Sequence, residues 1–437
     1  MLIELAISNF RSIRDRQVLT FRAEGNVGKK TLPDNLIVPT QKSHGEALIK
    51  TAVFYGANAS GKSNFLWAFN ILQTMVVESK AYQLDKPIDA YKPYKLDKTS
   101  YQAPTTFEIE FVAKDGIRYR YEVSYDKLNI LKEDLYFYPN ARNTVRKSLL
   151  FSRKRTGKIE AGEHYRGKQD FEVNPNQLIL SHAGIAHPMI VEAYRFFSNY
   201  LFYAPAQSAT FDETMLKMAE HYLSMEDNRL KKAIISIVSA GDIGISDIFI
   251  QKLDEKTVKI FDGLSDEDRQ KAFHLFRNRI KTVHPIYEGG TLVEERVFDL
   301  SEESTGTIKL LGLAGFIVDA LQDGSSVIVD EMDKNLHPLL SRMLIDMFQN
   351  PEMNPHNAQL LFSTHDVNLM DRDLFRRDQI YIIDKNTEGV STVKRLSDFT
   401  GISKVIPIQK WYMLGMFKGV PAINSYQINV NLAQQHG

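Results

Sequence analysis

The chain has 437 residues, 43% hydrophobic and 25% charged, a composition that predicts a soluble globular protein of two or three structural lobes. Lys plus Arg and Asp plus Glu number 54 each, so net charge gives no argument for binding nucleic acid or an anionic membrane. The absence of cysteine excludes disulfides, thiolate zinc sites and a cysteine nucleophile, and it fits a cytoplasmic protein.

The first residues, MLIELAISNFRSIRD, predict a strand and not a targeting segment. Apolar and polar residues alternate from Leu2 to Phe10, as in an amphipathic strand. A signal peptide would begin with basic residues followed by an unbroken apolar core. The longest apolar region, Leu310 to Val318, is too short to span a bilayer, so no membrane segment is expected.

The segment GANASGKSN, Gly56 to Asn64, fits the phosphate-binding pattern G-x-x-x-x-G-K-[ST]. It follows a short apolar segment, Ile49 to Tyr55, that is rich in strand formers. After it, apolar residues recur at helical spacing as far as Glu78. A strand, a glycine-rich loop and a helix in this order are the setting of a P-loop; the alternative is an ordinary glycine turn before a helix.

In a P-loop each of these residues has a separate task. Glycines let backbone N–H groups turn toward an anion, and the helix N-terminus adds a partial positive charge. Lys62 would reach the β- and γ-phosphates of a nucleotide, and the Ser63 hydroxyl would ligate Mg²⁺. The residues predicted to bind the nucleotide are Gly56, Asn58, Ala59, Ser60, Gly61, Lys62, Ser63 and Asn64.

The middle of the chain predicts antiparallel hairpins and then helices. Between about residues 100 and 160 the sequence alternates around Asp115-Gly116 and again around Thr156-Gly157, both turn signals. We interpret the basic cluster at residues 153–155 as a solvated hairpin tip, with a nucleic-acid patch as the alternative. From about 185 to 285 the chain is expected to be mainly helical, with a return to strand in GDIGISDIFIQKLD.

From about residue 295, helical segments alternate with apolar segments of strand length. A helix is predicted from Thr307 to Leu321 and another from Pro338, with strands in SSVIVDE, AQLLFSTHD and DQIYIID. This alternation is typical of a parallel sheet covered by helices on both faces. The core that contains the P-loop is therefore expected to be split into an early and a late half.

Acidic, serine, glycine and histidine residues in the late half fit the same kind of site. Asp330 and Glu331 end a buried strand, where Asp330 would hold Mg²⁺ and Glu331 would polarise the attacking water; the alternative is an acidic pair that caps the next helix. Ser304 and Gly306 precede a helix and would offer donors to an anion. His365, at the end of a strand, would contact a γ-phosphate.

These motifs in this order resemble the heads of ABC-type ATPases, including chromosome-maintenance and double-strand-break repair ATPases. The resemblance implies that Arg11 and Ser12 of the early NFRS approach the nucleotide. It also implies that Ser304 and Gly306 act on the nucleotide held by a second subunit, with residues 335–337 at the dimer seam. The glutamine loop of the class has no clear match, because Gln102 fits by position only.

Several sequence segments resemble more closely those of a prokaryotic family of stand-alone AAA/ABC-type ATPases from abortive-infection modules. These are the PARIS-type and RloA-like systems, related to the ATPase half of OLD proteins. The segments are NFRSI, GANASGKSN, LSEESTGT, VIVDEMDKNLHPLL, QLLFSTHDVNLMD, RRDQIYIIDK and YMLGMFKGVPAI. This resemblance implies a cytoplasmic Mg²⁺-dependent ATPase that forms a homodimer, or a multiple of dimers, around ATP. It further implies a phage-encoded trigger and a separate effector, a nuclease of the Toprim type or a toxin.

Two other functions compete with this one. A DNA-repair or chromosome-maintenance ATPase acting with a nuclease on DNA would carry long heptad insertions, and the predicted helical lobe shows none. A self-contained OLD-like nuclease would carry spaced acidic metal ligands in a further domain after His365, where the few acidic residues look solvated.

The predicted fold class is α/β: an ABC-type P-loop NTPase head with a split mixed or parallel sheet, flanking helices, an antiparallel β region and an inserted helical lobe. The predicted divisions are 1–95 for the first core half with the P-loop, 96–184 for the antiparallel region, 185–290 for the helical lobe, 291–400 for the second core half and 401–437 for the tail.

Overall fold

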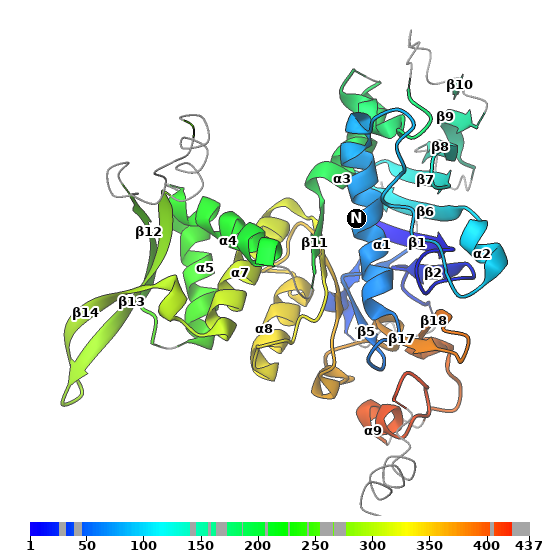
Figure 1. The fold of residues 1–437 in the computed structure, drawn as a ribbon. Helices are drawn as coiled ribbons and strands as arrows, with labels where there is room; N and C mark the ends of the chain where they lie inside the picture. Colours follow the sequence, from blue (N-terminus) through cyan, green and yellow to red (C-terminus); the bar gives the residue numbers. More distant parts are fainter. Residues whose placement is uncertain are drawn as a thin grey trace, which may run out of the picture. The chain divides into compact units, whose positions relative to one another are not determined.

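The computed structural model divides the chain into two compact units (Figure 1). Unit 1 contains Asn199–Leu361 together with Met1, and unit 2 contains Leu2–Ser198 and Phe362–Gly437. The structure describes residues 1–25, 32–38, 46–139, 146–155, 159–162, 173–185, 187–205, 209–225, 228–242, 244–253, 265, 277–402 and 406–421. Within these ranges no helix combines the length and the apolar character that crossing a membrane requires.

Unit 2 contains an antiparallel sheet whose described strands follow the order β10-β9-β8-β7-β6-β1-β2. The pairing of β6 with β7 confirms the hairpin predicted around Asp115-Gly116, where Gly116 has φ 76°. The turn predicted at Thr156-Gly157 lies outside the described residues, although β9 and β10 pair on either side of it. The strands are β1 (Leu2–Ser8), β2 (Gln17–Thr20), β6 (Thr105–Val112), β7 (Arg118–Tyr125), β8 (Ile130–Tyr138), β9 (Ser148–Lys154) and β10 (Ile159–Ala161).

A second sheet of unit 2 carries the predicted P-loop. Strand β5 (Thr51–Tyr55) runs parallel to β17 (Ile380–Lys385), which pairs antiparallel with β18 (Ser391–Arg395). Strand β16 (Gln359–Ser363) lies on the other side of β5 and crosses the unit boundary between Leu361 and Phe362. A small pair, β3 (Leu36–Ile37) and β4 (Leu48–Ile49), precedes β5.

Aromatic side chains hold the helices of unit 2 on its two sheets. Helix α1 (Lys62–Glu78) packs Phe65 edge-on against Phe54 of β5. Helix α3 (Pro188–Asn199) stacks Phe196 on Phe111 of β6, with ring centroids 4.0 Å apart. The other described helical segments of unit 2 are short: η1 (Pro33–Asn35), η2 (Ser79–Ala81), α2 (Lys98–Gln102), η3 (Leu180–Ile185), η6 (Val367–Leu369), η7 (Arg377–Gln379), η8 (Leu396–Asp398) and α9 (Ile408–Met413).

Unit 1 is built around helix α7 (Thr305–Asp323), which packs against α4 (Ala209–Ser224) and α5 (Asn228–Gly241). A Cβ added to Gly315 of α7 would lie 2.7 Å from the backbone nitrogen of Ala219, so this helix crossing requires glycine. The described strands follow the order β11-β15-β16, and β11 is parallel to β15. Their bounds, with the following helix, are β11 (Leu201–Ala204), β15 (Ser326–Val329) and α8 (Pro338–Gln349).

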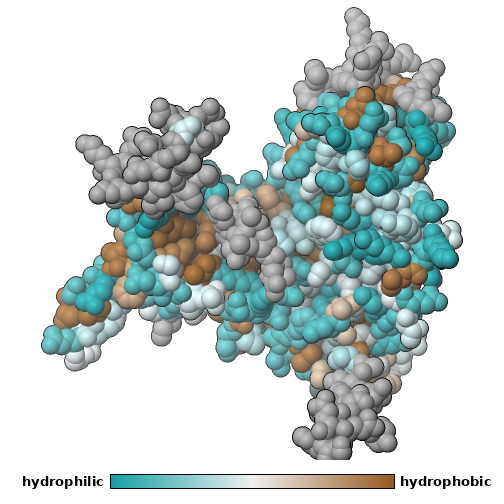
Figure 2. All heavy atoms as spheres, viewed as in Figure 1, coloured by the Kyte–Doolittle hydropathy of each residue, from teal (hydrophilic) through white to brown (hydrophobic). Residues whose placement is uncertain are grey.

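A three-stranded antiparallel sheet completes the described part of unit 1: β12 (Asp247–Lys252), β13 (Asn278–Glu288) and β14 (Thr291–Asp299), followed by η5 (Leu300–Glu302). Strand β14 is its edge among the described strands, and Leu292, Val293 and Val297 each expose more than half of their surface. Figure 2 shows hydrophobic colour along this hairpin.

The predicted helices and strands on either side of the P-loop and in the late half are confirmed. The region from about 185 to 285, expected to be mainly helical, contains α3, α4 and α5; it also contains strand β11, whose four residues carry too short a pattern to stand out. One expectation is wrong. Arg153 is only 5% exposed, whereas Lys154 and Arg155 are exposed, so the basic cluster is not simply a solvated hairpin tip. Arg153 ends a part of β9, from Leu150 onward, that is buried throughout, and exposure begins at Lys154.

A buried ion pair stabilises the part of unit 2 that precedes β17. Arg376 Nη2 lies 2.8 Å from Asp378 Oδ2, and the two side chains are 2% and 0% exposed. The same carboxylate accepts the backbone N–H of Glu24 at 2.8 Å. Removing one partner of such a pair leaves a charge uncompensated in a dry environment.

We therefore expect Asp378→Ala to lower the free energy of unfolding by ~3–5 kcal/mol. The half-exposed helical pair Glu192–Arg195 (2.6 Å) provides the matched control, and Glu192→Ala should cost only ~0.5 kcal/mol. Chemical denaturation of the three proteins measures the difference. Equal losses in the two variants would contradict the special role of the buried pair.

Candidate functional site

The backbone of the predicted P-loop adopts a conformation that requires its glycines. The loop leaves β5 at Gly56 and passes through the left-handed region at Ala59 (φ 61°) and Gly61 (φ 108°) before α1 begins. A Cβ on Gly61 would overlap Ser391 Oγ and lie 2.8 Å from Ser12 Oγ. A Cβ on Gly56 would lie 2.5 Å from the carbonyl oxygen of Ile383. The glycines of the motif are therefore fixed by close contacts and not only by φ.

The loop presents donors at the start of a helix, as an anion site does. Lys62 is 6% exposed and its Nζ donates to the carbonyls of Gly56 (2.9 Å) and Ala57 (3.2 Å). The Ser60 hydroxyl is buried and has no hydrogen-bond partner among the described residues. Ser63 is exposed in the first turn of α1, where backbone N–H groups lack acceptors within the helix. These features fit a phosphate group, with the Ser63 hydroxyl available to Mg²⁺.

A chain of hydrogen bonds through two serine hydroxyl groups connects the P-loop with an early and a late segment of the unit 2 sequence. Asn64 Nδ2 donates to Ser12 Oγ at 2.6 Å, and Ser12 Oγ lies 2.7 Å from Ser391 Oγ. Ser391 Oγ is also 2.6 Å from the carbonyl oxygen of Ser60. A carbonyl only accepts and each hydroxyl donates one proton, so the chain runs from Asn64 through Ser12 and Ser391 to Ser60. It fixes the backbone on both sides of Gly61.

The NFRS segment lies beside α1. Arg11 is in the left-handed region (φ 50°), and its guanidinium lies over the ring of Trp67 at 4.0 Å. Its backbone N–H donates to Lys92 O at 2.7 Å. Together with the contact of Ser12 with Asn64, this places Arg11 and Ser12 next to the P-loop helix.

His365 is exposed close to the point where the P-loop begins. The backbone N–H of Thr364 donates to Phe54 O at 3.2 Å, and Tyr55 Oη donates to Asp366 O at 3.1 Å. The residues before and after His365 are thus bonded to the last two residues of β5.

The C-terminal segment also reaches the P-loop. Gly419 (φ 67°) lies so close to it that an added Cβ would be 3.6 Å from Gly56 Cα and 3.2 Å from Ile383 O. Tyr412 Oη donates to the carbonyl of Gly419 at 2.8 Å. Burial raises the pKa of Tyr412 to about 12, so this donor keeps its proton at neutral pH.

In unit 1, Asp330 and Glu331 directly follow β15, as predicted. Asp330 is 5% exposed, and its backbone N–H donates to Ala204 O of β11 at 2.7 Å. Glu331 is half-buried in the left-handed region (φ 50°), which costs a non-glycine residue ~1–2 kcal/mol. Lys309 Nζ of α7 donates to Glu331 O at 2.8 Å. Strained backbone of this kind collects at functional sites because the surroundings hold it in place.

Ser304 and Gly306 lie where α7 begins. Ser304 caps the helix by accepting the N–H of Thr307 at 3.1 Å. A Cβ on Gly306 would lie 2.6 Å from Asn335 O, so the segment after Glu331 and the start of α7 are in contact. His337 caps α8 by accepting the N–H of Leu339 at 3.2 Å.

The predicted site residues therefore form two clusters. Unit 2 brings together the P-loop, Arg11, Ser12 and His365, and unit 1 brings together Ser304, Gly306, Asp330 and Glu331. Sequence reasoning missed Ser391, Gly419 and Lys309. Lys309 carried a usable signal, because it lies one helical turn after Gly306 and faces the same side. Ser391 carried none, since its partners are remote in sequence.

Residues 52–371 match the model of a protein family described as "AAA domain, putative AbiEii toxin, Type IV TA system". The chain belongs to this family. The matched range includes the P-loop, the start of α7, Asp330-Glu331 and His365 of this AAA ATPase. It leaves out Arg11, Ser12, Ser391 and Gly419, which hold the P-loop from outside the range.

Three solved structures are distantly similar to this AAA ATPase, each at 13% sequence identity. A structural maintenance of chromosomes (SMC) head bound to the C-terminal winged-helix domain of ScpA has a TM-score of 0.45, covering 91% of this chain and 99% of that one. The SMC head domain of Thermotoga maritima has a TM-score of 0.39, with 90% and 98% covered. An SMC head with an extended coiled coil, bound to a ScpA domain derived from Pyrococcus furiosus, has a TM-score of 0.38, with 94% and 98% covered. A search of curated proteins finds no match.

Loss of the hydroxyl chain should weaken nucleotide binding more than turnover. Ser391→Ala removes both hydrogen bonds of this hydroxyl, at a net cost of ~1 kcal/mol, so we expect ATP to bind roughly fivefold more weakly with kcat nearly unchanged. Titration with a fluorescent ATP analogue, combined with steady-state kinetics, measures both quantities.

Thr392→Ala is the matched control, since Thr392 is exposed on the same strand. It should bind ATP as the native chain does. Native-like affinity in Ser391→Ala, or an equal loss in Thr392→Ala, would show that the hydroxyl chain does not position the P-loop.

Proposed function

We propose that the chain is the ATP-binding and ATP-hydrolysing subunit of an anti-phage, abortive-infection module, and that it controls a separate effector. The observation that carries the first part is the P-loop at the start of α1. Its glycines, its buried lysine and the Ser60 hydroxyl, which has no hydrogen-bond partner among the described residues, fit an anion. The defence part is supported by the family description, which names a putative toxin of a toxin–antitoxin system.

Each predicted residue has a chemical task in this proposal. Lys62 and the backbone N–H groups of the loop bind the phosphates, and Ser63 and Asp330 hold Mg²⁺. Bound Mg²⁺ supplies positive charge against the phosphate oxygens. Glu331 takes up the proton of the attacking water, and His365 donates to the terminal phosphate.

The second proposed element is a homodimer, or a multiple of dimers, closed by ATP. Ser304 and Gly306 would bind the nucleotide of the opposite subunit, with Asn335 and His337 at the seam. Support comes from their position: Ser304, Asn335 and His337 are exposed, and they lie together at the start of α7 and in the segment before α8. Closure would depend on ATP because each nucleotide then bridges two chains.

The effector is proposed to be a separate nuclease, of the Toprim type, or a separate toxin, and the trigger to be phage-encoded. In the described part of residues 185–290 the inserted region contains α4, α5 and the strands of a small sheet. This supports a compact regulatory lobe more than the long coiled coils of a chromosome-maintenance ATPase. We place the protein in the cytoplasm.

We expect Glu331→Gln to bind ATP normally and to hydrolyse it at least about a hundredfold more slowly, because the general base is lost while the phosphate contacts remain. Light scattering should then show an ATP-dependent dimer that persists. Phosphate release and nucleotide affinity, measured on the same preparation, separate chemistry from binding. Native turnover in Glu331→Gln would show that Glu331 is not the base.

Two controls separate binding from closure. Lys62→Ala should bind no ATP and should not dimerise with it. Ser304→Arg, combined with Glu331→Gln, should bind ATP and remain monomeric because the arginine blocks the proposed seam. A stable ATP-dependent dimer of that double variant would refute the role of Ser304 at the seam.

The regulatory role predicts a stoichiometric partner. Tagged Glu331→Gln, purified from cells that express its native operon, should retain a nuclease-like or toxin-like protein, identified by mass spectrometry. The Lys62→Ala chain, purified in parallel, controls for partners that do not depend on nucleotide. Recovery of DNA or of a repair nuclease alone, or toxicity of the chain expressed without any partner, would overturn the proposal of a separate effector.

A further inference from the structure

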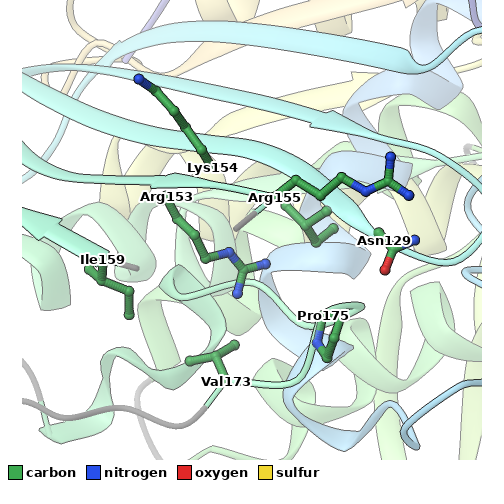
Figure 3. A pocket seen from close by; sticks show the side chains of 8 residues that line it. Asn129, Arg153, Lys154, Arg155, Ile159, Val173 and Pro175 are labelled. Atoms are coloured by element: carbon green, nitrogen blue, oxygen red, sulfur yellow. The ribbon is translucent and has the colours of Figure 1, made fainter. Parts of the chain in front are cut away.

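The basic cluster at the end of β9 lines a cavity that the proposed ATPase cycle does not use. The cavity has a volume of about 70 Å³ and lies within unit 2. Arg153 and Arg155 contribute two guanidinium groups and Asn129 an amide, and the described residues of the lining include no carboxylate (Figure 3). The rest of the lining is Ile130, Lys154, Ile159, Val173 and Pro175.

Arg153 is unusual because it is charged and 95% of its surface is buried. Long charged side chains are almost never fully buried unless they are paired. One of its five N–H donors is used: Nη2 donates to the carbonyl of Gln177 at 2.7 Å. Figure 3 shows its guanidinium directed into the space between Asn129 and Pro175.

The carboxylate opposite Arg153 forms its hydrogen bonds with other groups. Glu133 lies opposite Arg153 in the register of β8 and β9 and is fully buried. Its oxygens already accept the N–H groups of Ile179 (2.8 Å) and Leu180 (3.0 Å) and the hydroxyl of Tyr121 (2.9 Å). Arg155 adds a second guanidinium to the described lining of the cavity.

The walls of the cavity are held by hydrogen bonds. The N–H of Ile130 donates to Pro175 O at 2.7 Å, which ties the segment around Pro175 to β8. Gln177, which accepts from Arg153, donates through Nε2 to the carbonyls of Lys80 (3.0 Å) and Tyr82 (2.8 Å). The guanidinium of Arg153 is therefore held in position before any ligand arrives, which lowers the entropic cost of binding one.

We propose that this cavity binds a phosphate group. The planar guanidinium donates two parallel N–H bonds to a tetrahedral oxyanion, and the small volume admits one such group. The phosphate belongs either to a nucleic-acid backbone or to a small free phosphate. Lys154 does not take part, because its ammonium points away from the two guanidinium groups (Figure 3).

The test uses Arg155→Gln, since Arg155 is exposed and its replacement leaves the fold intact, whereas loss of the buried Arg153 endangers it. Lys154→Gln is the matched control, because Lys154 is the exposed neighbour of Arg155 and its replacement removes the same charge. All proteins carry Lys62→Ala as well, so that the P-loop does not contribute. Calorimetric titrations use inorganic phosphate and, separately, a 12-residue single-stranded oligonucleotide.

We expect Arg155→Gln to weaken phosphate binding about tenfold or more, and Lys154→Gln to change it less than about twofold. Tighter binding of the oligonucleotide than of phosphate, also lost in Arg155→Gln, would assign the site to a nucleic-acid backbone; phosphate binding alone would assign it to a free phosphate. No binding of either probe, or equal losses in Arg155→Gln and Lys154→Gln, would overturn the proposal. Because every protein lacks Lys62, either outcome leaves the proposed ATPase function untouched.

Discussion

The candidate site of unit 2 depends on one constraint, the left-handed backbone at Gly61. The loop can turn there only if no side chain is present, and the hydroxyls of Ser12 and Ser391 occupy the space that a Cβ would need. The same two hydroxyls bind Asn64 and the carbonyl of Ser60. The geometry of the candidate phosphate-binding loop is therefore a tertiary property. A short motif supplies the glycines, and segments remote from each other in the sequence fix their positions.

In unit 1 the corresponding constraint is the backbone of Glu331. A left-handed glutamate is strained, and Lys309 holds it by binding its carbonyl oxygen. The carbonyl of Asn335, a few residues on, leaves no room for a side chain at Gly306. The proposed base is thus coupled to the first turns of α7 by short contacts. A ligand that moved the start of this helix would change the position of the carboxylate without touching it.

What could be predicted from the sequence was local. Glycine spacing and apolar periodicity identify β5, the P-loop, α1 and α7, because these signals lie within a few residues of each other. Contacts between segments that are remote in the sequence produce no such local pattern. Ser391 and Gly419 meet the P-loop only after folding, and the four residues of β11 show too short a pattern to stand out from a helical region. Arg153 was misread because β9 is buried as far as Arg153 by segments remote in the sequence, such as Gln177, which accepts from its guanidinium.

Equal numbers of acidic and basic residues exclude a large net charge on the whole chain, but they do not exclude a local excess of positive charge. On the seven-stranded sheet and beside it, cations share carboxylates: Arg22 and Arg118 pair with Glu110, and Arg120, Lys132 and Lys147 pair with Glu122. Burial alone would raise the pKa of Glu122, but these three cations lower it to about 2. At the end of β9 two guanidinium groups line a cavity whose described lining holds no carboxylate, and Glu133 lies opposite Arg153 in the strand register. A buried charge is costly to the fold, and an anionic ligand is a physical reason for keeping it.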